Sequence, residues 1–78
     1  MPTIDRVRGY RFFFYSNEAG EPPHIHVENG GCYAKYWLDP VALANPGGFN
    51  VSELMKLRRI VTEKRELYQE KWNEFFGR

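Results

Sequence analysis

EPPHIHVENGGCYAKYWL, residues 21–38, is the stretch that decides the fold, because it reads as two β-strands joined by a tight turn. The segments HIHVE and CYAKYWL flank Asn29, Gly30 and Gly31, and Asn-Gly between extended segments is a strong hairpin signal. The stretch also contains both histidines of the chain and its only cysteine. The face on which each of these side chains lies is therefore set by the turn.

A two-residue turn at Asn29-Gly30, or one shifted to Gly30-Gly31, divides the hairpin into the same two faces, since directly opposed residues share a face. The first face is apolar and consists of Ile25, Val27, Cys32, Ala34, Tyr36 and Leu38. The second is polar and aromatic and consists of His24, His26, Glu28, Tyr33, Lys35 and Trp37. A one-residue slip would expose apolar side chains at about 1.5–3 kcal/mol each. We therefore expect the imidazoles and the thiol on opposite faces.

The segments around the hairpin predict a small α+β protein. GYRFFFYS (residues 9–16) is a third strand candidate, and residues 41–44 are a short fourth one. From Ser52, the expected helix cap, the apolar period becomes helical, with a single stripe of Leu54, Leu57, Val61, Tyr68, Trp72 and Phe75. We predict one domain over residues 1–78. In it a three- to four-stranded antiparallel meander (1–44) packs against a long C-terminal helix or a helix pair (52–76).

The length of the helical segment leaves two alternatives open. About 25 residues at 1.5 Å each form a rod longer than a six-residue strand, so part of the apolar stripe would extend beyond the sheet. Either the helix breaks between Thr62 and Arg65, where the stripe is interrupted, or the extension packs against a second chain. The second alternative implies a homodimer or another partner.

Composition and charge exclude several classes of protein. A single cysteine allows no disulfide within the chain, which is typical of a reducing compartment. No apolar run approaches the roughly 20 residues needed to span a bilayer, and the N-terminus does not look like a signal peptide, so we expect a cytoplasmic protein without membrane contact. The net charge of +1 argues against binding nucleic acid through bulk electrostatics. Residues 52–78, however, hold seven Lys/Arg against five Asp/Glu.

The polar face suggests an enzyme acting on nucleic acid as one hypothesis. In an RNase-like reaction His24 and His26 would be acid and base, with Arg11 and Lys35 stabilising the developing phosphate charge. The predicted nucleic-acid contacts are Arg58, Arg59, Arg65, Trp37 and Tyr33. A wider set of basic residues that includes Arg6, Arg8, Lys56 and Lys64 is available for phosphates as well. The alternative for both groups is an ordinary solvated surface.

Metal binding is another hypothesis for the histidines, and the residue pattern of the hairpin does not favour it. Cys32 lies on the apolar face, which argues against a His-His-Cys zinc site in the hairpin. Zinc would need two further ligands from elsewhere, and the nearby candidates are Glu18, Glu21 and Glu28. We therefore predict no metal ligands and no cofactor, and keep a metal site on His24 and His26 as an alternative.

Over essentially the entire chain the sequence resembles the short bacterial proteins of the domain of unknown function 4160 family. The resemblance rests on MPTI, GYRFFFYSNE, EPPHIHVENG, YAKYWLDPVALA and WNEFF, with the Pro-Pro-His-x-His-Val segment as the most recognisable mark. It implies no reaction and transfers no catalytic residues. Members are often encoded beside a second small protein, in an arrangement similar to toxin–antitoxin pairs. The resemblance thus implies a toxin-like protein that acts through a cognate small protein encoded nearby.

Overall fold

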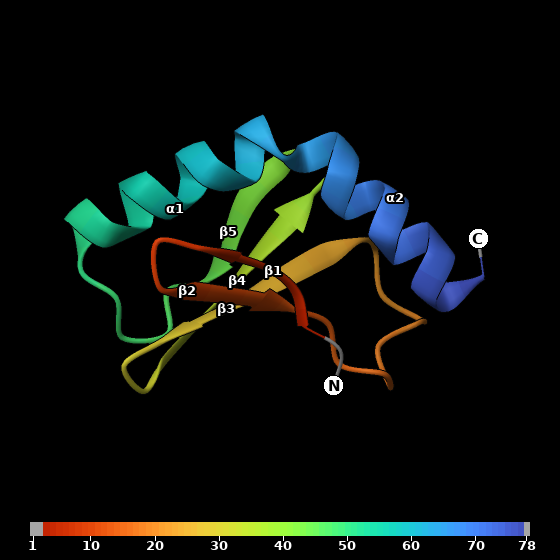
Figure 1. Cartoon of the computed structure of the whole chain (residues 1–78), viewed down its shortest axis with the longest axis horizontal. Helices are drawn as coiled ribbons and strands as arrows, with labels where there is room; N and C mark the ends of the chain where they lie inside the picture. The colour runs from red at the N-terminus through yellow and green to blue at the C-terminus, as the bar shows by residue number, and fades with distance from the viewer. Residues whose placement is uncertain (1–2, 78) are drawn as a thin grey trace.

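The computed structural model describes residues 3–77 and consists of a five-stranded antiparallel sheet with two helices packed against it (Figure 1). The sheet order is β1-β2-β3-β4-β5, so each strand pairs with the next one in the chain. The elements are β1 (Thr3–Val7), β2 (Tyr10–Phe13), β3 (His24–Asn29), β4 (Cys32–Leu38), β5 (Val41–Asn45), α1 (Val51–Glu63) and α2 (Arg65–Phe76). This confirms the predicted α+β meander with C-terminal helices.

The sheet has more strands than the sequence predicted. The segment Thr3–Val7 was not recognised as a strand, because its charged centre hides the alternation that marks a half-buried strand. It pairs with β2 through a turn at Arg8-Gly9, in which both residues have positive φ (52° and 87°). The residue expected there is asparagine or glycine, so an arginine gave no hairpin signal.

The β3–β4 hairpin uses the second of the two predicted turns. Gly30 and Gly31 have φ of 57° and 84°, a conformation that glycine adopts without strain, and Asn29 pairs with Cys32. The division into two faces is confirmed. Ile25 pairs with Tyr36, and the helices cover this face.

The helical segment is broken at Lys64, within the predicted interval, so it forms two helices. The cap prediction was wrong. Asn50, and not Ser52, caps α1, since its side-chain oxygen accepts a hydrogen bond from the Glu53 amide at 2.8 Å. Ser52 lies inside the first turn of the helix.

The helix break is tied to the N-terminal strand. The Lys64 ammonium lies 2.7 Å from Asp5 Oδ2, and the Tyr68 hydroxyl donates a hydrogen bond to the same oxygen at 3.0 Å. The Asp5 carboxylate on β1 therefore binds both Lys64, the residue at the break, and Tyr68, the first buried residue of α2.

The core lies between the sheet and the helices. It consists of Phe12, Phe14, Ile25, Val27, Ala34, Tyr36, Leu38, Phe49, Leu57, Val61, Tyr68 and Trp72. Most of the predicted stripe is buried, but Phe75, near the end of α2, is 39% exposed. Phe76 packs against the core in its place. Within residues 3–77 no helix is long and apolar enough to cross a membrane.

Candidate functional site

The two histidines lie on the face of β3 opposite the apolar side chains that pack under the helices, and His24, the first residue of the strand, also contacts Trp72 of α2. Strand alternation puts His24 and His26 on one side of β3, where they face Trp37 and Lys35 of β4. The connection between β2 and β3, residues 14–23, brings Glu18 to the same side. This connection turns back at Glu18, where the Glu21 amide donates a hydrogen bond to the Glu18 carbonyl.

One carboxylate oxygen meets both imidazoles. Glu18 Oε1 lies 2.8 Å from His24 Nε2 and 2.7 Å from His26 Nε2. The three potential ligand atoms lie within 4.8 Å of one another. The His24 side chain is fully buried, and those of His26 and Glu18 are only 12% and 16% exposed. The three groups thus form a compact, largely buried cluster.

The contact of His24 Nδ1 determines which ring nitrogen of His24 carries a proton. Nδ1 lies 2.9 Å from the Pro22 carbonyl oxygen, which can only accept a hydrogen bond, so Nδ1 carries a proton. In a neutral ring Nε2 then presents a lone pair to the Glu18 carboxylate. Two acceptors at 2.8 Å repel each other unless a proton or a metal cation lies between them.

The environment shifts the pKa of Glu18 and that of His26. Burial raises the pKa of Glu18, but the hydrogen bonds from His24 and His26 outweigh it, so the pKa lies below its ordinary value. Burial of the ring lowers the pKa of His26 despite the attraction of the Glu18 carboxylate. At neutral pH the site therefore offers a carboxylate and a neutral imidazole, the protonation states in which these groups bind metals.

Aromatic side chains enclose the cluster. The Phe13 ring stacks on His26 at 5.5 Å between centroids, and the Tyr15 ring meets the edge of His26 at 4.6 Å. His24 packs against Trp72 at 4.8 Å and Trp37 at 5.6 Å. These rings exclude water and hold both imidazoles in place.

The two predicted phosphate-stabilising residues lie on the same face, but each is paired with a carboxylate. Arg11 Nη1 lies 3.0 Å from Glu28 Oε1, and its guanidinium sits 4.4 Å above the Phe13 ring. Lys35 Nζ lies 2.6 Å from Glu21 Oε1. Their charge is thus largely balanced within the fold.

The predicted nucleic-acid contacts are not brought together. Arg58 and Arg59 are exposed on α1, whereas Tyr33 lies on the opposite face of the sheet and is 50% exposed. Trp37, also on that face, lies under the Lys35 ammonium at 4.4 Å. On α2, Arg65 is engaged with the Leu38 carbonyl and Asp39. These five residues therefore do not form one continuous surface.

Sequence reasoning placed the histidines and the thiol correctly but did not single out Glu18. Cys32 packs against the core on the apolar face, as predicted. Glu18 was one of three acidic candidates, and its position depends on the path of a loop, for which no periodic pattern exists. The available signal was an acidic residue six positions before His24 in a loop that ends in two prolines.

A family model described as Domain of unknown function (DUF4160) matches residues 9–73. The chain belongs to the DUF4160 family. The matched region contains Glu18, His24 and His26 and reaches into α2, and it confirms the resemblance seen in the sequence. Searches of the curated proteins and of the solved structures gave no match to this chain. DUF4160 membership assigns no reaction.

Proposed function

We propose that this DUF4160 protein binds a divalent transition-metal ion, such as zinc or iron, through Glu18, His24 and His26. The observation that carries the proposal is the position of one carboxylate oxygen 2.8 Å and 2.7 Å from two imidazole nitrogens. In this arrangement a metal ion would take the place of the protons that now link the three groups.

The donor set suits such an ion. Two imidazoles and one carboxylate form the ligand set of many catalytic zinc sites and of non-haem iron(II) sites, where the remaining positions hold water or substrate. The hydrogen bond from His24 Nδ1 to the Pro22 carbonyl is the kind of outer contact that orients metal-binding histidines. It leaves Nε2 as the nitrogen available to the metal.

The same geometry weakens the RNase-like alternative. Both ring nitrogens of His24 are engaged, and the side chain has no exposed surface, so it is poorly placed to exchange a proton with a substrate. His26 is bound to the same carboxylate. An acid–base pair would need at least one imidazole open to the substrate.

The experiment is a metal titration of the purified chain produced without a polyhistidine tag. Bound metal is first measured by elemental analysis, and the chelator-treated protein is then titrated with Zn²⁺ by calorimetry. Glu18→Gln and His26→Gln remove a ligand with little change in volume. Glu28→Gln, on the same face but paired with Arg11, is the matched control.

We expect one Zn²⁺ per chain, with affinity lowered at least tenfold in the two ligand variants. The control should bind like the original chain. A chain that takes up no Zn²⁺, or ligand variants that bind as tightly as Glu28→Gln, would contradict the proposal.

We also propose a second function, binding of the cognate small protein encoded nearby, on the β5–α1 face. We use this name for the surface formed by Tyr36, Leu43, Val51, Leu54, Met55 and Arg58, which encloses a hollow of about 240 Å³. Val51 and Met55 are 73% and 65% exposed, unusual values for apolar side chains so close together. The hollow adjoins β5, an edge strand of the sheet.

The chemistry of this face suggests the form of the partner. Edge strands pair with extended segments of other chains, and the apolar hollow suits alternate apolar side chains of such a segment. Arg58 has no ion-pair partner among residues 3–77, which favours an acidic residue in the partner. The proposed partner segment is thus extended, apolar and acidic.

This second function is tested by co-expression with the neighbouring gene and co-purification. Met55→Asp should abolish retention of the partner, whereas Leu67→Asp on α2, where the leucine is 41% exposed, should not. Failure to co-purify, or equal retention by both variants, would contradict it.

A further inference from the structure

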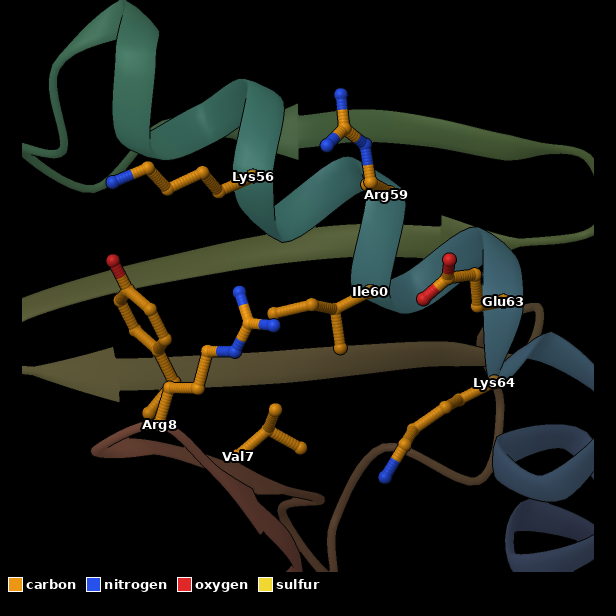
Figure 2. Close-up of a pocket in the computed structure, with 8 residues that line it drawn as sticks. Val7, Arg8, Lys56, Arg59, Ile60, Glu63 and Lys64 are labelled. Carbon is orange, nitrogen blue, oxygen red and sulfur yellow. The ribbon is translucent and has the colours of Figure 1, made fainter.

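A second hollow lies on the helix-covered side of the sheet, away from the histidines. It is formed where the β1–β2 turn approaches α1, and it has a volume of about 350 Å³. Figure 2 shows the Arg8 side chain reaching from the turn towards Ile60, with Lys56 extending from the helix. The hollow is lined by Val7, Arg8, Tyr10, Lys56, Arg59, Ile60, Glu63 and Lys64.

The charges at this hollow are unevenly balanced. Lys64 is neutralised by Asp5 at 2.7 Å. Among residues 3–77, the side chains of Arg8, Lys56 and Arg59 make no hydrogen bond or ion pair with any acceptor. Glu63 is the one carboxylate in the lining. Three unpaired cations at one hollow favour an anionic ligand.

The backbone at Arg8 is unusual as well. Its φ of 52° is the only positive value at a non-glycine residue in the part of the chain that the structure describes. Left-handed backbone is uncommon for a long side chain, and asparagine or glycine is the ordinary choice at this turn position. Arginine there sacrifices local stability and places a guanidinium at the mouth of the hollow.

The remaining lining residues narrow the ligand class. Val7, Ile60 and the Tyr10 ring provide an apolar surface of the kind that packs against a nucleobase. The Glu63 carboxylate can accept hydrogen bonds from sugar hydroxyls. A volume of about 350 Å³ is in the range of small-molecule sites.

We infer that this hollow binds a ribonucleotide, with its phosphate on Arg8, Lys56 and Arg59 and its base against Ile60 and Tyr10. The nucleotide is either free or part of single-stranded RNA, since both present the same chemistry. The site lies across the sheet from Glu18, His24 and His26, so its occupancy does not depend on a metal ion at the histidines.

The test uses the complete chain and follows amide chemical shifts by NMR. The probes are inorganic phosphate, adenosine monophosphate and a short single-stranded oligoribonucleotide, each titrated into the isotope-labelled protein. Arg8→Asn is the informative variant, because asparagine suits the positive φ and keeps the turn while the guanidinium is lost. Lys71→Gln, which removes one positive charge from α2, is the matched control.

We expect shifts at the β1–β2 turn and along α1 with the nucleotide or the RNA, and weaker effects with phosphate alone. Arg8→Asn should weaken binding about tenfold or more without lowering the melting temperature. Lys71→Gln should bind like the original chain. Tighter binding of RNA than of adenosine monophosphate identifies the polymer as the ligand, and the reverse order identifies the free nucleotide.

Three results would overturn the inference. They are the absence of shifts with all three probes at millimolar concentration, equal binding by Arg8→Asn and the original chain, and an equal loss in Lys71→Gln. A further variant separates a nucleotide from a simple anion. Glu63→Gln should weaken adenosine monophosphate but not inorganic phosphate, and an equal effect on both would exclude the nucleotide.

Discussion

His24 Nε2 lies 2.8 Å from Glu18 Oε1, although His24 belongs to a strand and Glu18 to the loop before it. With Nδ1 held by the Pro22 carbonyl, this contact cannot exist between two bare acceptors. The DUF4160 chain therefore holds either a proton or a cation at this point. A bound cation would add to the stability of the fold beyond what a shared proton contributes.

Zinc should stabilise the chelator-treated chain against heat. A ligand at 100 times its dissociation constant adds about 2.7 kcal/mol to the free energy of unfolding, which for a domain of this size raises the melting temperature by about 10 °C or more. Thermal unfolding with and without Zn²⁺ measures the change. Glu18→Gln should lose most of it, and an equal rise in that variant would indicate binding elsewhere.

His24 should contribute to stability even without metal. Its ring is fully buried against Trp72, so His24→Ala leaves a cavity and removes one of the two imidazoles that pair with Glu18, at a cost of about 2–4 kcal/mol. Urea unfolding of the chelator-treated proteins checks this value. His26→Ala should cost less, because its side chain is partly exposed, and the opposite order would show that His24 is not the structural member of the pair.

Asp5 should make stability depend on acid pH. Burial raises its pKa, but the hydrogen bonds from Lys64 and Tyr68 outweigh this and hold the pKa below the ordinary value of 3.8. A carboxyl group whose pKa is lowered by folding stabilises the protein above its unfolded pKa and loses this effect as the pH falls through the folded pKa.

Asp5→Asn should therefore cost about 1–2 kcal/mol at neutral pH, and the difference from the original chain should shrink below pH 4. Urea unfolding over a pH series measures it. A difference that stays constant down to pH 2 would mean that the carboxylate charge is not the stabilising feature.

Gly47 should tolerate no side chain. A Cβ atom there would lie 1.6 Å from the Tyr33 carbonyl oxygen, and the backbone has a φ of +60°. The Gly47 carbonyl also accepts a hydrogen bond from the Tyr33 amide, so the loop cannot move away freely. We expect Gly47→Ala to cost about 4 kcal/mol or more, or to prevent folding. Gly20→Ala, with open space around it, should cost less than about 1 kcal/mol.

The cap of α1 gives a simple comparison. Asn50→Ala removes the hydrogen bond to the Glu53 amide and should destabilise the protein by about 1 kcal/mol. Ser52→Ala should be nearly neutral, because Ser52 lies inside the helix. Equal effects in urea unfolding would show that the side chain of Asn50 is not the effective cap.

Strand alternation explains why the hairpin could be predicted from sequence. The faces of His24, His26 and Cys32 depend only on whether the turn has an even number of residues, and both candidate turns met that condition. The register itself was not determined by the pattern. The observed turn pairs His26 with Lys35, whereas a turn at Asn29-Gly30 would have paired it with Tyr33.

The contacts that complete both candidate sites were beyond sequence reasoning. Glu18 contacts the histidines from an irregular loop. Arg8 approaches α1 from a two-residue turn, at a position where an arginine is not expected. Periodicity places residues on strands and helices, but it gives no information about the path of a connection. For the same reason the pairing of Asp5 with Lys64 across 59 positions could not be foreseen.

The origin of Glu18 in a connecting loop has a practical consequence for the chain as a whole. Two of the three candidate ligands belong to strand β3, so a bound ion would link the connection of residues 14–23 to the sheet through Glu18. Limited proteolysis would then report on the ion directly, since a protease needs several residues of detached backbone to cut. Cleavage after Tyr15 or Glu18 would mark the chain without the ion, and resistance there the chain that holds it.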